Sequence, residues 1–126
     1  MASELRVTTI ANNAGNESVN TTYVINGSAK AWANIDASAT LNDSLNISSA
    51  ADTSALYKTM SLSNNFANEN YATSSQSGSA TGTYANTPVH GTLLTTSTYR
   101  TASFNVSNGA AVETTKNVSI AFGDLA

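Results

Sequence analysis

The sequence predicts an all-β fold, an antiparallel β-sandwich of jelly-roll type or a related barrel, with an extended N-terminal arm. Three observations support this. Ala, Ser, Thr and Asn make up more than half of the 126 residues, and Ser, Thr and Asn disfavour helices because their side chains bond to the nearby backbone. Turn-forming residues recur about every ten residues. Between the turns lie short segments in which apolar and polar residues alternate with a period of two, as in half-buried strands.

Residues 1–27 are the expected arm. A first strand covers 5–9, an Asn-rich turn follows at 12–16, and a second strand covers 19–25 with Val19, Tyr23 and Ile25 on one face. The arm precedes the segment that carries the single tryptophan. We expect it to serve attachment and oligomerisation, with residues 28–126 forming the sandwich domain.

Alternation continues through residues 28–126. In 28–35 the odd-numbered Ala and Ile residues face one way and Lys30, Trp32 and Asn34 face the other. The even-numbered residues of 56–62 form a mostly apolar row. Near the end, 102–106 and 118–122 present the apolar stripes that contain Phe104 and Phe122. These two segments flank a turn at 108–109 and are expected to pair as antiparallel neighbours. Turns are also expected at 87–88 and 90–91, and a surface loop at 76–82.

The composition excludes several classes of function. The formal net charge is −3 with five Lys and Arg residues, so there is no clustered positive charge to bind nucleic acid or an anionic membrane surface. There is no cysteine, which excludes disulfides and thiolate metal sites. The first residues carry no apolar run of a signal peptide, and no stretch reaches the ~20 apolar residues of a membrane helix. We therefore expect no membrane insertion.

Catalytic signatures are weak, and we expect a non-enzymatic protein without catalytic, cofactor-binding or metal residues. His90 is the single histidine, and a solvated loop position is its favoured reading because no GxSxG elbow accompanies it. A Ser-His-carboxylate hydrolase stays open as an alternative. Eight carboxylates are spread along the chain without a glycosidase-like pairing or a calcium-loop pattern.

Bulky apolar residues are scarce, because a large part of the hydrophobic 40% is alanine. Ordering the backbone costs roughly 1–2 kcal/mol per residue, which a thin core offsets poorly. We therefore expect association of identical subunits to contribute to stability. The residues expected to anchor the core or the subunit interface are Trp32, Lys30, Phe104 and Phe122, with Lys30 either pairing with Asp36 or Asp43 or protecting a strand edge.

One stretch resembles a known family. Residues 27–36 read Gly-Ser-Ala-Lys-Ala-Trp-Ala-Asn-Ile-Asp, and residues 41–49 read Leu-Asn-Asp-Ser-Leu-Asn-Ile-Ser-Ser. This resembles a domain of bacteriophage tail-fibre and related virion proteins, whose pattern is G-x-A-K-A-W-x-N-F followed by D-S-[FL]-N-[VI]-S-S. The family's next hairpin corresponds to 50–62, its N-Y-A segment to 70–72 and its closing strand to 118–124. Ile35 stands where the family usually has an aromatic residue.

The resemblance implies a virion structural protein, made in the host cytoplasm and located in the particle. It implies a homotrimer, which we expect to contact other virion proteins through the arm. A tail-fibre or surface appendage subunit is the preferred role and a capsid decoration (cement) protein the alternative. A host-glycan-binding module is a further alternative, in which the tyrosines would cluster on one exposed patch: Tyr23, Tyr57, Tyr71, Tyr84 and Tyr99.

Overall fold

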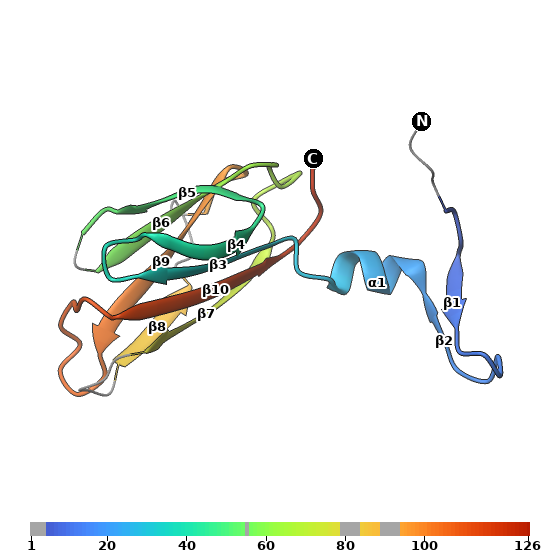
Figure 1. Ribbon diagram of the computed structural model, residues 1–126, viewed down its shortest axis with the longest axis horizontal. Helices are drawn as coiled ribbons and strands as arrows, with labels where there is room; N and C mark the ends of the chain where they lie inside the picture. Colours follow the sequence, from blue (N-terminus) through green and yellow to red (C-terminus); the bar gives the residue numbers. More distant parts are fainter. Residues whose placement is uncertain (1–4, 55, 79–83, 89–93) are drawn as a thin grey trace.

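Strands dominate the structure. The computed structural model describes residues 5–54, 56–78, 84–88 and 94–126, with 84–88 described by its backbone (Figure 1). In chain order the elements are β1 (Thr9–Ala11), β2 (Ser18–Asn20), α1 (Thr21–Gly27), β3 (Ala31–Asp36), β4 (Leu41–Leu45), β5 (Ile47–Asp52), β6 (Tyr57–Leu62), β7 (Ala72–Gly78), β8 (Tyr84–Pro88), β9 (Thr98–Asn105) and β10 (Lys116–Phe122). All of their pairings are antiparallel. The prediction of an all-β protein is confirmed.

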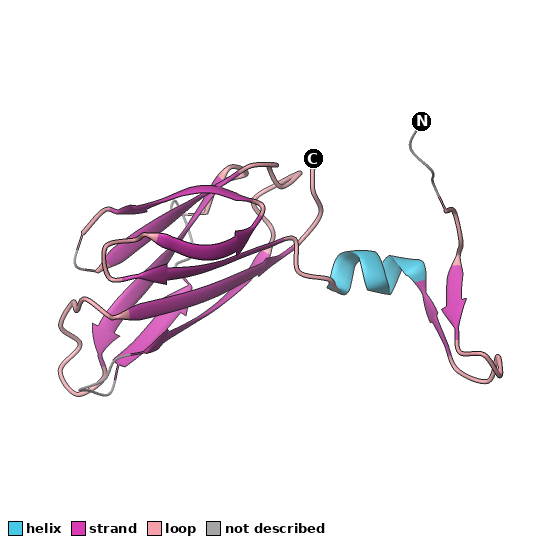
Figure 2. Ribbon diagram, in the orientation of Figure 1, coloured by secondary structure: helices cyan, strands magenta, loops and turns pink. Residues whose placement is uncertain are grey.

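The strands of residues 28–126, which we call the body, form two four-stranded sheets with the orders β4-β3-β10-β7 and β5-β6-β9-β8. Figure 2 shows the two sheets as layers, with β1, β2 and α1 lying apart from them. The buried apolar cluster draws residues from both sheets, and all of its members lie between 31 and 121. From β3 it takes Ala31, Ala33 and Ile35, as the alternation predicts, and from β6 Met60 and Leu62.

Small polar residues fill part of the space between the sheets. Thr101 and Ser103 of β9 and Asn117 and Ser119 of β10 are all buried. The Ser103 hydroxyl donates to Asn117 Oδ1 at 3.1 Å, and Ser119 shares a hydrogen bond with the Tyr99 hydroxyl at 2.9 Å. These bonds lower the penalty of burying polar groups, but the groups add little apolar burial, so the core is thin.

One expectation about the last strands is wrong. β9 and β10 lie in different sheets, so the turn at 108–109, where Gly109 has a φ of 67°, leads from one sheet to the other and does not close a hairpin. The apolar stripes that contain Phe104 and Phe122 lie on the outer faces, where Ala102 is buried and both phenylalanines are half-buried, while the intervening polar residues point inward and are buried. Period-two alternation specifies two faces but does not say which one is inside.

Three further segments differ from expectation. Residues 21–27 are helical, because the Asn20 side chain accepts the Thr22 N–H at 2.8 Å and caps α1, which ends the strand after three residues. Pro88 ends strand β8 instead of lying in a turn, at a sheet edge where proline is tolerated. Residues 76–78 belong to β7, whereas 79–82 lie outside the described residues.

The first and last strands of the body are neighbours. β10 pairs with β3 from Lys116–Asp36 to Ala121–Ala31, so the chain enters and leaves the body at the same pole, next to α1 (Figure 1). At this pole Phe66 and Tyr71 stack with ring centroids 4.1 Å apart. Gly123 passes so close that a Cβ on it would lie 2.6 Å from Tyr71 Cβ. The opposite pole carries the connections at 37–40, 53–54 and 106–115 (Figure 1).

Candidate association surfaces

Trp32 lies on the outer face of the β4-β3-β10-β7 sheet. It is half-buried, and it stands opposite Leu45 of β4 and Ile120 of β10. Leu45 is 48% exposed and Val118 is 41% exposed, while Phe122 on the same face is half-buried. Trp32 and Phe122 therefore lie outside the core, on a modest apolar stripe that runs across three strands.

Phe104 lies elsewhere. It is half-buried on the outer face of the other sheet, where its backbone forms an isolated bridge with Ala111. The structure therefore does not bring the four expected anchors together: Trp32 and Phe122 share one face, Phe104 is on the opposite layer, and Lys30 precedes β3.

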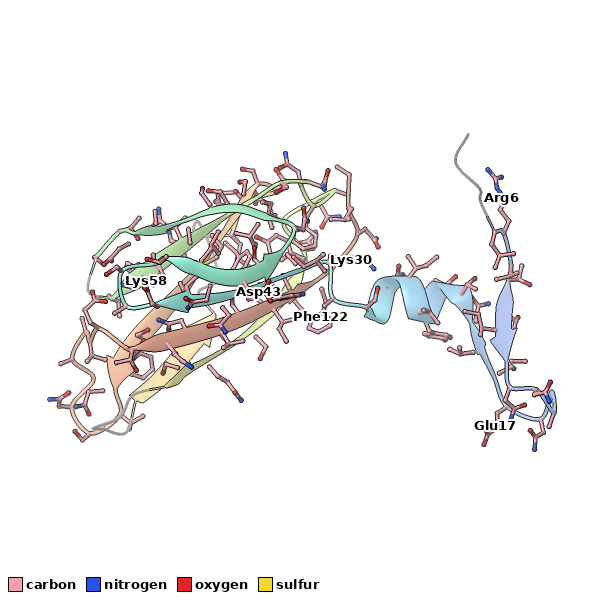
Figure 3. All side chains as sticks on the ribbon, viewed as in Figure 1. Arg6, Glu17, Lys30, Asp43, Lys58 and Phe122 are labelled. Carbon is pink, nitrogen blue, oxygen red and sulfur yellow. The ribbon has the colours of Figure 1, made fainter. Side chains whose placement is uncertain are left out.

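Lys30 ties the helix to the body. Its ammonium donates to the Ile25 carbonyl oxygen and, at 2.6 Å, to Ser28 Oγ, and its backbone N–H donates to Ala121 O at 2.9 Å. Figure 3 shows Lys30 at the junction between α1 and the two sheets. Among the described residues no ion pair joins Lys30 to Asp36 or Asp43.

Asp36 instead holds the turn after β3. Its Oδ1 accepts the backbone N–H groups of Thr40 at 2.8 Å and Ser38 at 2.9 Å. The Thr40 hydrogen bond is the largest cause of the lowered pKa of the Asp36 carboxyl. The Asp36 carboxylate is therefore bonded to the backbone of the turn that follows it. The chain reverses direction in this turn, where Ala39 has a φ of 60°.

A buried cation was missed by the sequence reading. Lys58 of β6 is 2% exposed, and its ammonium lies 2.5 Å from Glu113 Oε2 and 2.9 Å from Asp52 Oδ1. The two carboxylates are 43% and 38% exposed. The arrangement clamps the long 106–115 connection to β5 and β6. Lys58 occupies an inward position of a mostly apolar row, which is the signal that could have predicted a buried, paired lysine.

The four tyrosines whose side chains the structure describes do not form the patch that a glycan-binding site would need. Tyr71 and Tyr99 are buried, and burial raises the pKa of each to about 12. Tyr57 is half-buried on β6, and Tyr23 is exposed on α1, apart from the body. The Tyr84 side chain and His90 lie outside the described residues, so the expectations for them stay predictions.

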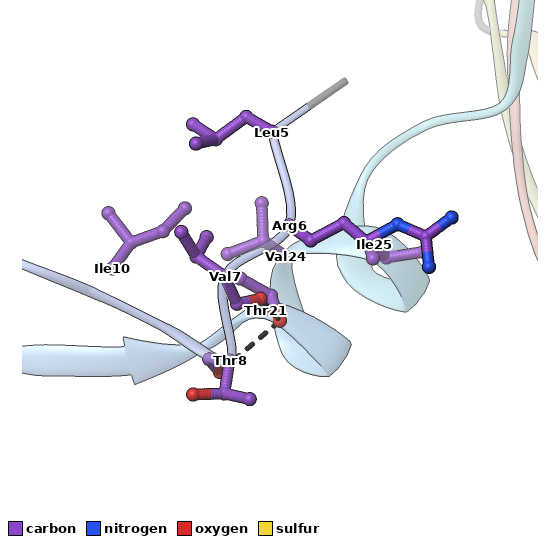
Figure 4. A pocket seen from close by; sticks show the side chains of 8 residues that line it. All are labelled: Leu5, Arg6, Val7, Thr8, Ile10, Thr21, Val24 and Ile25. Carbon is purple, nitrogen blue, oxygen red and sulfur yellow. Dashed lines mark hydrogen bonds between the residues drawn. The ribbon is translucent and has the colours of Figure 1, made fainter.

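Residues between 5 and 25 line an apolar cleft. Its volume is about 590 Å³, and it lies between the chain leading into β1 and the helix α1 (Figure 4). The Thr21 hydroxyl donates to the carbonyl oxygens of Val7 at 2.9 Å and Thr8 at 3.2 Å and so fixes the floor of the cleft. The lining is mostly apolar: Leu5, Arg6, Val7, Thr8, Ile10, Thr21, Val24 and Ile25.

Within the described ranges, no group of three or more His, Cys, Asp or Glu side chains is placed to hold a metal ion. The same part of the chain contains no helix that is long and apolar enough to cross a membrane.

Comparisons with protein-family models, with curated proteins and with solved structures find no match for this chain.

Proposed function

We propose that the chain is a non-enzymatic structural subunit of a bacteriophage particle, a tail-fibre or surface appendage protein that works as a homotrimer. The Ala-Lys-Ala-Trp segment carries the resemblance to virion proteins. The observation that carries the structural role is the distribution of exposed apolar residues. Of the eleven large apolar residues exposed within the described part of the chain, seven lie in residues 5–25.

In this proposal the body is a β-sandwich, of jelly-roll type or a related barrel, and residues 1–27 are an arm for attachment and oligomerisation. The arm adds no residue to the core of the body. Exposed apolar surface of this extent on a segment that projects from its domain marks an interaction site. The arm then contacts further copies and other virion proteins, and the opposite pole of the body faces outward.

The test is detection of the protein on intact particles. Particles purified by density gradient are digested and analysed by mass spectrometry, and antibody raised against the purified chain is located on them by electron microscopy. The expected result is a constant copy number per particle with label on a fibre or appendage. Label over the capsid shell favours the decoration protein instead. Absence from purified particles, with the chain present in the infected-cell lysate, refutes the proposal.

A further inference from the structure

We propose that the arms of neighbouring copies dock head to tail, with the Tyr23 side chain of one arm seated in the apolar cleft of the next. This rests on the proposed oligomeric role and names the surface that carries it. The occupant of the cleft is a second copy of this chain.

The arm needs a partner because its elements are too short to stand alone. β1 and β2 have three residues each and α1 has seven. Helices shorter than about 12 residues and isolated two-stranded hairpins are marginal in water without tertiary packing. Every residue from 5 to 27 is exposed except Thr21, which is half-buried. Packing against the chain's own body does not supply the missing burial, since the arm lies apart from both sheets (Figure 1).

The two faces of α1 differ. Thr21, Val24 and Ile25 are spaced at i, i+3 and i+4, so they share one face of the helix, and all three line the cleft. Tyr23 is absent from the cleft lining and is 75% exposed. The arm therefore presents an apolar hollow on one side and a projecting aromatic ring on another, which are complementary features on the same chain.

The exposed area on the arm suits a stable interface. Taking roughly 170–260 Å² for a fully exposed Val, Leu, Ile or Tyr, the seven exposed apolar residues of the arm present roughly 800 Å². In a head-to-tail assembly each arm divides this area between two neighbours, which leaves roughly 400 Å² of apolar surface for each contact. Because about 57% of an interface is non-polar, each contact would bury roughly 700 Å² per partner, close to the ~800 Å² of a standard interface. On the sheet face beside Trp32, the exposed Leu45 and Val118 present roughly 170 Å², an amount that monomers carry routinely. The arm, rather than the sheet face, is the main contact between copies.

The geometry of the contact also constrains the assembly. A Tyr23 side chain that enters a neighbour's cleft makes a heterologous contact, because different patches of the two copies meet. Such contacts either close into a cyclic assembly or continue as a filament. Closure with three copies gives each arm one filled cleft and one buried tyrosine.

Two full-length variants test this. Tyr23→Ser removes the ring and keeps the cleft, whereas Val7→Asp puts a charge into the cleft and keeps the ring. Val118→Asp is the matched control, because Val118 and Val7 are 41% and 44% exposed and the substitution is the same. Mass is measured by light scattering during size exclusion at micromolar concentration. The emission of Trp32, the single tryptophan, reports whether the body stays folded.

We expect the parent chain and Val118→Asp to be trimers and both arm variants to be monomers with unchanged Trp32 emission. A one-to-one mixture of the arm variants should give a dimer and nothing larger, since only one intact ring–cleft pair can form. Monomeric variants whose mixture stays monomeric overturn the head-to-tail contact. Arm variants that stay trimeric, with Val118→Asp dissociated, move the interface to the sheet face and leave the oligomeric role intact. A monomeric parent chain overturns both the contact and the oligomeric role.

Discussion

Removing the negative charges around Lys58 is expected to destabilise the protein more than removing Lys58 itself. The double variant Asp52→Asn, Glu113→Gln leaves an ammonium whose side chain is 3% exposed without either of its two ion-pair partners. Breaking a buried pair in this way costs about 3–5 kcal/mol, and we expect the lower end because the amide oxygens still accept its hydrogen bonds.

Lys58→Met is the reverse case. Methionine keeps the unbranched side chain in the inward row of β6, and the two carboxylates left behind are 38% and 43% exposed. Water therefore solvates them, and the cost is only about 1 kcal/mol, the usual net value of hydrogen bonds and exposed ion pairs. In a domain of this size each 1 kcal/mol lowers Tm by about 4–8 °C, so the two variants separate clearly.

The free energy of unfolding is measured by urea titration at pH 7, with Trp32 emission as the signal. Protein concentration is held fixed because the proposed association would contribute to apparent stability. Glu113→Gln alone is the control and should fall between the two, since Asp52 Oδ1 remains 2.9 Å from the ammonium. A Lys58→Met variant that loses as much stability as the double carboxylate variant, or more, refutes the asymmetry.

Three further predictions concern packing, pH and the outer face. Gly123→Ala is expected to lower the free energy of unfolding by about 1–3 kcal/mol through overpacking against Tyr71. Gly78→Ala should be tolerated, because the atom nearest to the added Cβ, Lys116 Cβ, is 3.8 Å away. Equal melting temperatures of the two variants would contradict this. Because Tyr71 and Tyr99 have a pKa of about 12 against an ordinary 10.0, the unfolded chain loses these protons first. Stability should therefore hold below pH 10 and fall between pH 10 and 12, with a smaller fall in Tyr99→Phe when denaturation is followed against pH. Trp32→Ala should lower the melting temperature, because the buried part of the Trp32 side chain is lost. The trimer mass measured by light scattering should not change. Dissociation of the variant would place the interface on the sheet face.

The sequence predicts the strands best where one face is uniformly apolar. In 31–36, Ala31, Ala33 and Ile35 reach the core as expected, and the 50–62 hairpin forms from β5 and β6. The first case relies on local pattern, which needs no knowledge of which sheets will meet, and the second follows from the resemblance to the virion proteins.

The failures occur where tertiary context decides. Nothing in 102–106 or 118–122 reveals that small hydroxyl and amide groups would point inward and the larger apolar side chains would lie on the outer faces. The hydrogen bonds between Ser103, Asn117, Ser119 and Tyr99 exist only after the sheets pack. The α1 segment alternates as a strand does, and one local contact, the Asn20 cap, decides for the helix. The candidate surface on the arm follows from that helix, so alternation alone could not reveal it.

Because β3 lies beside β10, both ends of the body are at one pole, and the two poles suit different kinds of added sequence. The junction between α1 and the body, the C-terminal Ala126 and the Phe66–Tyr71 stack all belong to one pole. In the proposed head-to-tail assembly, an affinity tag at the C-terminus would therefore lie near the contacts between copies. A peptide inserted into residues 106–112 would lie at the other pole, in the part of the connection that precedes Glu113 and its ion pair with Lys58. That pole offers a place to display foreign epitopes away from the surface proposed to join the copies.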